Sequence, residues 1–259
     1  MNNTNNLWNK KHFWNNYQVA SDDYKERREL ISNIIPDDVN SIIDIGCGKG
    51  EIINSLSSIK KNIKLLAVDV TDINKANIKS DFLIGSLPNI KVKDKSFDLV
   101  LCLEVLEHLS NDIFQESLNE LSRIAKKYII IGVPYRENLQ TKQTHCNTCN
   151  KTFHIDGHLR TFNNISNLFK DFKLENKILA GIKQKRQITF FVKLKNILGN
   201  YYYEDERICP FCNNKIEQEK VKLLNRVFIF LIKIINKLFL ISKKSIPYWI
   251  IGIYKVKES

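Results

Sequence analysis

The stretch DIGCGKGEI, residues 44–52, is the feature that most constrains how this chain can fold. It follows the apolar run SIIDI and precedes a helical pattern, so the sequence predicts a strand, a tight turn and a helix. Gly46, Gly48 and Gly50 permit the positive φ angles of such a turn and a close approach of backbone to ligand. Their G-x-G-x-G spacing differs from the G-x-G-x-x-G of dinucleotide sites, so the turn favours a ligand other than a dinucleotide.

Short apolar runs alternate with helical patterns along the chain, which predicts a parallel sheet with right-handed crossovers. We therefore expect an α/β fold with a Rossmann-like, mostly parallel seven-stranded sheet. The expected strands are residues 41–45, 64–70, 81–85, 97–103, 128–133, 172–182 and 248–256. The expected helices are residues 21–35, 50–59, 72–79 and 112–126.

Two carboxylates accompany the glycine turn. Asp44 lies at the end of the first strand, where it could hold an ammonium group. Asp69 ends the next strand about 20 residues further on, where a carboxylate reaches ribose hydroxyls. Together, SIIDIGCGKGE, LLAVD and SFDLVLCLEVLEHL resemble the class I S-adenosylmethionine-dependent methyltransferases, particularly the small-molecule O-, N- and C-methyltransferases. The resemblance covers roughly residues 8–182 and the final strand.

The resemblance implies S-adenosylmethionine as cofactor and assigns a role to each motif. The turn would line the methionine part, Asp69 would bind the ribose, and the residues after the fourth strand would close the far wall. The family commonly has Gly-Asp after the third strand, where this chain has Gly85-Ser86, so Ser86 or the Leu87 backbone would meet the adenine. The expected cofactor-binding residues are Asp44, Gly46, Cys47, Gly48, Asp69, Val70, Ser86, Leu87 and Leu103.

The segment CLEVLEHL places Glu104, Glu107 and His108 on one face of an expected helix, at the carboxyl end of the fourth strand. Small-RNA 2′-O-methyltransferases and ubiquinone-pathway O-methyltransferases look similar here. With His158, or His154, these residues could bind Mg²⁺ or Mn²⁺. Without a metal, His158 or His108 is the candidate general base, and Glu104 is the third candidate catalytic residue.

Four of the six cysteines form two Cys-x-x-Cys pairs, Cys146/Cys149 and Cys209/Cys212. Each pair is followed by an asparagine, which tolerates the positive φ that such knuckles need. We expect one structural Cys₄ zinc site that joins two insertions. A rival set combines Cys146 and Cys149 with His154 and His158, but it leaves the second pair without a metal.

Residues 218–244 predict an apolar helix with a narrow basic stripe formed by Lys222, Arg226, Lys233, Lys237 and Lys244. Charges interrupt the apolar run, so a helix in the membrane interface fits better than a transmembrane span. A helix that covers the domain or forms a dimer is the alternative.

The N-terminus lacks a secretory leader, so we expect a cytoplasmic protein, at the inner membrane face if the helix binds lipid.

These features predict four regions. Residues 1–40 are expected to form a cap that contains Trp8, Phe13, Trp14 and Tyr17. Residues 41–183 are expected to form the cofactor-binding core, with the first knuckle at 145–162. Residues 184–246 would form an insertion with the second knuckle and the apolar helix, and residues 247–259 the final strand.

We expect methyl transfer to a hydroxyl of a sugar, a glycolipid precursor or another small molecule. The net charge of +12 keeps RNA 2′-O-methylation as an alternative, although no RNA-binding module is recognisable. A second alternative is a non-catalytic, zinc-stapled binding protein on a methyltransferase fold.

Overall fold

The computed structural model describes residues 21–59, 62–205, 207–218, 220–241 and 243–258. The expected cap residues Trp8, Phe13, Trp14 and Tyr17 lie outside this part of the chain.

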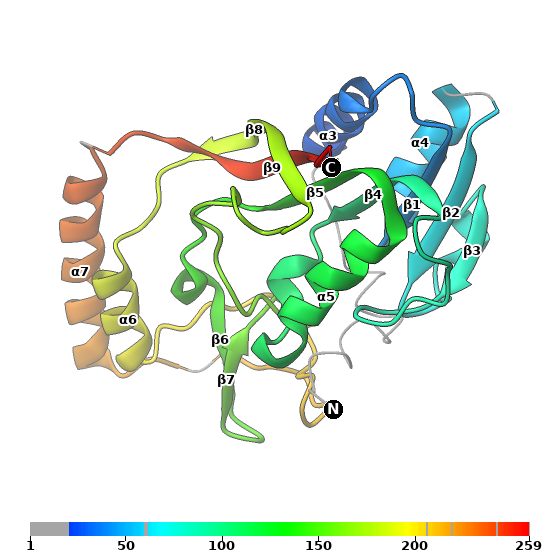
Figure 1. The fold of residues 1–259 in the computed structure, drawn as a ribbon. Helices are drawn as coiled ribbons and strands as arrows, with labels where there is room; N and C mark the ends of the chain where they lie inside the picture. Colours follow the sequence, from blue (N-terminus) through cyan, green and yellow to red (C-terminus); the bar gives the residue numbers. More distant parts are fainter. Residues whose placement is uncertain (1–20, 60–61, 206, 219, 242, 259) are drawn as a thin grey trace.

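A seven-stranded sheet forms the centre of the molecule, in the order β3-β2-β1-β4-β5-β9-β8 (Figure 1). The first five strands of this order run parallel, and β9 pairs antiparallel with both β5 and β8. The Rossmann-like, mostly parallel sheet expected from the sequence is therefore confirmed. Its strands are β1 (Ser41–Ile45), β2 (Lys64–Asp69), β3 (Asp81–Ile84), β4 (Phe97–Leu103), β5 (Ala125–Pro134), β8 (Phe172–Gln184) and β9 (Ile246–Val256).

Helices cover both faces of the sheet, because its central strands are apolar on both sides. On one face, α3 (Ser21–Ile34) and α4 (Glu51–Ile59) bury Ile31, Ile53 and Leu56 against β1, β2 and β4. On the other face, α5 (Asn111–Ile124) buries its apolar side together with the segment that leads into β8. The glycine turn and the ends of the parallel strands thus stand on a rigid core.

The helix expected over residues 72–79 is wrong, since only the 3₁₀ turn η1 (Lys75–Asn77) forms there. The segment has too few apolar residues to bury a helical face. Its backbone is instead bound by the Asn54 side chain, which donates to the Asn77 carbonyl at 2.7 Å and accepts from Lys79 N at 2.8 Å. A side chain from α4 thus supplies the hydrogen bonds that a helix would have made.

Further elements extend beyond this core. A hairpin of β6 (Gln143–Cys146) and β7 (Lys151–His154) follows the 3₁₀ turn η3 (Leu139–Lys142). The helices α6 (Thr189–Ile197) and α7 (Leu223–Ile241) lie side by side at the end of the molecule farthest from β3 (Figure 1). None of the helices in the described ranges combines the length and the apolarity that crossing a membrane requires.

Candidate active site and metal centres

The glycine turn has the conformation that its sequence predicts. Gly46, Gly48 and Gly50 have φ angles of 79°, 54° and 77°, in the left-handed region that glycine adopts without strain. A Cβ on Gly46 would also come within 2.3 Å of the Val105 side chain. The Gly48 amide donates a 2.9 Å hydrogen bond to Asp69 Oδ2, so the turn and the end of β2 are held together.

Asp44 and Asp69 are both buried at the ends of neighbouring parallel strands. Burial and the nearby charge of Asp69 raise the pKa of Asp44 to about 7. Burial also raises the pKa of Asp69, although the backbone N–H groups of Gly48 and Thr71 oppose that shift. Two close carboxyls that resist ionisation fit a ligand with positive charge. S-adenosylmethionine carries a sulfonium and an ammonium group and therefore fits this donor set.

The other expected cofactor-binding residues lie around the same strand ends. Gly85 donates to the Asp69 carbonyl at 2.9 Å, so Ser86 follows directly beside β2, and Ser86 forms a bridge with Asn89. The Leu87 side chain is buried in the core. The remaining members, Cys47, Val70 and Leu103, are partly buried.

The expected helix through Glu104, Glu107 and His108 does not form. Only Leu106–His108 are helical, as the 3₁₀ turn η2, and Glu104 precedes it with a φ of 56°. This left-handed backbone costs about 1–3 kcal/mol for a residue other than glycine and is found mostly where function requires it. The Glu104 amide is held by a 2.8 Å hydrogen bond to the Gly132 carbonyl. The strain turns the chain sharply at the end of β4.

The Glu107 side chain is fully buried, and neither carboxylate oxygen has a hydrogen-bond partner among the described residues. Burial and the charge of Glu104 raise its pKa well above the ordinary value. One ligand atom from each of Glu107, His108 and His158 lies within 4.8 Å of the others. Burial and the adjacent His158 lower the pKa of His108 to about 3, so this imidazole is neutral.

The structure adds Glu137, a residue that the sequence interpretation missed. It follows β5 and accepts a 2.5 Å hydrogen bond from His158 Nδ1, and both residues are buried. Burial would lower the pKa of His158, but the hydrogen bond and charge of Glu137 raise it. The signal that could have found Glu137 is its place after a strand at the carboxyl edge of the sheet, where active sites form.

His154 completes a group of three with Glu137 and His158. Its Nδ1 accepts backbone N–H groups of Asp156 and His158, both at 3.3 Å, so the proton of the neutral ring is on Nε2. That Nε2 lies 3.7 Å from Glu137 Oε1. His154 therefore belongs, with Glu137 and His158, to a second group whose ligand atoms lie close enough together to hold a metal ion. Since Nδ1 of His158 is bonded to Glu137, Nε2 is the His158 nitrogen available to Glu107 and His108.

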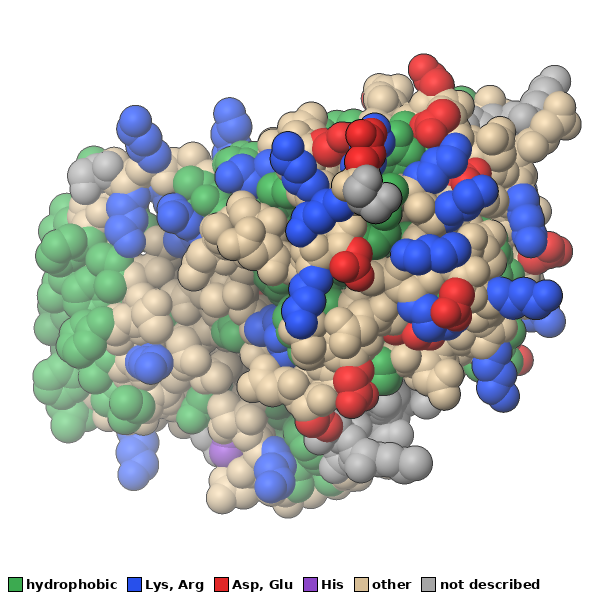
Figure 2. Space-filling model, viewed as in Figure 1, with side chains coloured by type: hydrophobic (Ala, Val, Ile, Leu, Met, Phe, Trp, Pro, Cys, Tyr) green, Lys and Arg blue, Asp and Glu red, His purple; other side chains and the backbone are tan. Residues whose placement is uncertain are grey.

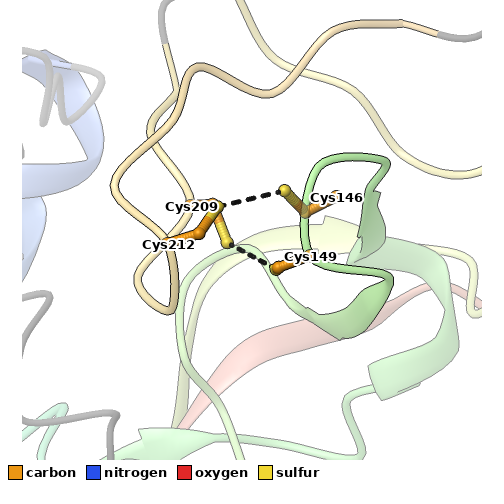
Figure 3. A group of neighbouring side chains, drawn as sticks. All are labelled: Cys146, Cys149, Cys209 and Cys212. Carbon is orange, nitrogen blue, oxygen red and sulfur yellow. Dashed lines mark hydrogen bonds between the residues drawn. The ribbon is translucent and has the colours of Figure 1, made fainter.

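The two cysteine pairs meet, as Figure 3 shows. The Sγ atoms of Cys146 and Cys212 lie 3.6 Å apart, as do those of Cys149 and Cys209, and all four fall within 4.8 Å. Tetrahedral Zn–S bonds of about 2.3 Å place sulfurs at about this separation, whereas a disulfide needs about 2.05 Å. The asparagines after the pairs, Asn150 and Asn213, have φ angles of 56° and 64°, as expected for such knuckles.

The cysteine cluster is connected to the histidine group through the β6–β7 hairpin. The first knuckle is the turn of this hairpin, and β7 ends at His154. Asp156, between the two histidines, pairs with Lys142 at 2.6 Å and with Arg207, near the second knuckle, at 3.5 Å. The rival set of Cys146, Cys149, His154 and His158 does not form, because both histidines face Glu137 instead.

The sheet order and the glycine turn with its paired aspartates are similar to those of class I S-adenosylmethionine-dependent methyltransferases. The family model described as a methyltransferase domain matches residues 43–131, which run from β1 into β5. An uncharacterised protein of Methanocaldococcus jannaschii is 28% identical over 132 residues, 48% of this chain and 56% of that protein. A ubiquinone biosynthesis O-methyltransferase of Rickettsia bellii is 34% identical over 97 residues, 35% of this chain and 40% of that protein. The chain thus spans about half the length of these curated relatives, or less.

Solved structures share the fold over nearly the whole chain. One is a chain from the complex between the Haloferax volcanii Trm112 methyltransferase activator and a methyltransferase, with a TM-score of 0.56, 13% identity and 100% of both chains covered. A second is a Pyrococcus horikoshii protein with a TM-score of 0.53, 13% identity and 93% of both chains covered. At these identities the likeness shows the fold alone.

Proposed function

We propose that this chain transfers a methyl group from S-adenosylmethionine to a hydroxyl of a small molecule, such as a sugar or a glycolipid precursor. The observation that carries the proposal is the buried group of Glu107, His108 and His158 at the end of β4. The group would supply a base beside the strand ends where the cofactor turn lies. The name of the Rickettsia bellii relative, an O-methyltransferase, supports a hydroxyl acceptor.

Asp44, Gly46 and Gly48 would hold the methionine part of the cofactor, and Asp69 would bind its ribose. When bound, the cofactor supplies an electrophilic methyl group. The chain must bind and orient the acceptor and remove its hydroxyl proton. His158 is the residue we assign to proton removal, because Glu137 binds its Nδ1, which leaves Nε2 as the ring nitrogen able to accept a proton, and His158 groups with Glu107 and His108.

A divalent cation bound by the same group is the alternative to His158 as the base, because a histidine that ligates a metal ion through Nε2 cannot accept a proton there. Glu107, His108 and His158 would hold the ion, since a buried carboxylate without a hydrogen-bond partner is stabilised by a nearby positive charge. Two imidazoles in the donor set favour Mn²⁺ over Mg²⁺. The ion would lower the pKa of the acceptor hydroxyl. Glu137, behind His158, would act as the carboxylate that orients a ligating histidine.

The first test is cofactor binding by isothermal titration calorimetry. We expect S-adenosylmethionine to bind the native chain, and we expect Asp69→Ala to weaken binding by about tenfold or more, because the ribose loses a charged acceptor. Asp81→Ala, an exposed carboxylate on β3, is the matched control and should leave the affinity unchanged. Absence of binding, or equal affinities for native chain and Asp69→Ala, would reject the cofactor site.

The raised pKa of Asp44 predicts a pH dependence of cofactor binding. A cationic ligand favours the ionised carboxylate, which dominates only above about pH 7. The dissociation constant at pH 6 should therefore be about tenfold higher than its limiting value above pH 7. Binding at pH 6 should release a proton, visible as a heat that depends on the buffer. Asp44→Asn should bind weakly and without this pH dependence. A flat profile for the native chain between pH 6 and 7.5 would contradict the role of Asp44.

Methyl transfer from labelled cofactor into cell extract, separated into lipid, RNA and small-molecule fractions, identifies the acceptor class. Label confined to RNA would replace the small-molecule proposal with RNA 2′-O-methylation.

A further inference from the structure

Helix α7 is attached to the rest of the protein by a narrow seam. Three of its side chains are buried, Ile229, Ile232 and Asn236, at steps of three and four residues. Asn225 extends the seam with a 3.2 Å hydrogen bond to the Leu198 carbonyl after α6. At about 100° per residue these positions cover only about 60° of the helix circumference.

Most of the remaining circumference is apolar and exposed. On α7 the exposed apolar side chains span an arc of about 180° beside the seam. They are Leu223, Leu224, Val227, Phe228, Phe230, Leu231, Ile234, Ile235, Leu238, Phe239 and Ile241, each 41% exposed or more. Phe190 and Ile197 of α6 add to this surface at 67% and 79% exposure. Figure 2 shows hydrophobic side chains covering the end of the molecule where α7 lies.

The charges around this surface are all of one sign. Arg226, Lys233 and Lys237 fall within about 40° of one another on the helix circumference, at the edge of the apolar arc away from the seam. All three are exposed. The sequence contains no aspartate or glutamate in residues 176–203 or 220–257, which include α6 and α7. The apolar face therefore has a basic border without acidic side chains of its own to neutralise it.

We propose that α7 docks on an anionic lipid bilayer, with its apolar arc in the interface and its basic edge against lipid phosphates. An apolar arc with a cationic border is the pattern of helices that lie in the membrane plane. A second copy of the chain fits less well, because packing the apolar arcs of two α7 helices together would leave the basic border of each helix without an acidic partner on the other helix. This surface lies outside the cofactor site, so its test stands apart from that of methyl transfer.

Flotation of the purified full chain with vesicles tests the proposal. We expect binding to vesicles of phosphatidylcholine with about 30% phosphatidylglycerol, and much weaker binding to phosphatidylcholine alone. Lys233→Glu with Lys237→Glu should lower partitioning onto the anionic vesicles by tenfold or more, at about 1 kcal/mol for each lysine removed. Phe230→Ser with Leu238→Ser should lower partitioning similarly, because it removes apolar area that the bilayer would bury.

Matched variants elsewhere on the surface control for charge and for exposed apolar area. Lys91→Glu with Lys93→Glu makes the same charge change on exposed loop positions, and Ile59→Ser removes an apolar side chain that is 62% exposed on α4. Both should bind vesicles like the native chain. Unchanged circular dichroism spectra and thermal midpoints show that each variant is folded. Absence of vesicle binding, equal binding to neutral and anionic vesicles, or a dimer in light scattering that Phe230→Ser with Leu238→Ser dissociates would overturn the proposal.

Discussion

Replacing His158 with alanine is expected to lower kcat for methyl transfer by about 10²–10⁴-fold, the usual contribution of a positioned general base. Cofactor affinity should change by less than about twofold, because the cofactor turn lies on other strand ends. We expect kcat to fall while cofactor affinity stays nearly constant, because His158 belongs to the Glu107–His108 group and not to the Asp44–Asp69 pair. Steady-state kinetics with the identified acceptor, together with calorimetry for the cofactor, measures both quantities.

Glu137→Gln separates orientation from catalysis at the same site. Glutamine keeps the size of the side chain but removes the charge that raises the pKa of His158. The acidic limb of the profile of kcat against pH should therefore move to lower pH, with a smaller loss of rate than His158→Ala causes. His145→Ala is the matched control, because this half-buried histidine contacts Thr152 and Tyr201 and lies outside the Glu107–His108–His158 group. A rate for His158→Ala that equals the native rate would remove this residue from the reaction.

Replacing Cys209 with serine is expected to abolish stoichiometric zinc and to lower the thermal midpoint by about 10 °C or more. Native protein should contain about one zinc per chain by mass spectrometry of metals. Structural zinc contributes folding free energy directly, and a loss of several kcal/mol moves the midpoint of a chain of this size by about that much. The cluster has little else to hold it, since its apolar neighbours are few, among them Ile216 and Phe153.

Cys47→Ala controls for the loss of a thiol outside the cluster. It should keep full zinc content, because Cys47 lies in the glycine turn. Less than about half a zinc per chain in the native protein, or full zinc in Cys209→Ser, would reject the proposed Cys₄ site.

The sheet could be predicted from the sequence because its strands are short apolar runs that end at glycines and aspartates. The segment at residues 72–79 could not, because its conformation depends on hydrogen bonds from the distant Asn54 side chain. The sequence could predict that the two cysteine pairs lie together, because one pair supplies only two of the four ligands of a tetrahedral site. From the sequence alone, the apolar face of α7 could pack against a membrane or against protein. Choosing between them required the structure, which shows which side chains of α7 are buried.

Around the candidate base, the residue types were predictable but their arrangement was not. Glu104, Glu107 and His108 have helical spacing, yet the positive φ of Glu104 breaks the helix before it starts. Glu137 carries no motif, and its role emerges only when the hairpin brings His158 against it. Sequence spacing shows which groups share an element, whereas the contact between Glu137 and His158, 21 residues apart, depends on tertiary packing.

Because the first knuckle lies at the tip of the β6–β7 hairpin, the amount of zinc in the cell should affect the segment that carries the candidate base. Only four residues separate Cys149 from His154, and Arg207, near the second knuckle, forms an ion pair with Asp156 at 3.5 Å. A chain made under zinc starvation would keep its sheet and its cofactor turn, while the segment with the candidate base would lose its anchor. Such a chain should still bind the methyl donor but transfer the methyl group more slowly, so zinc scarcity would lower the rate of methyl transfer more than it lowers cofactor binding.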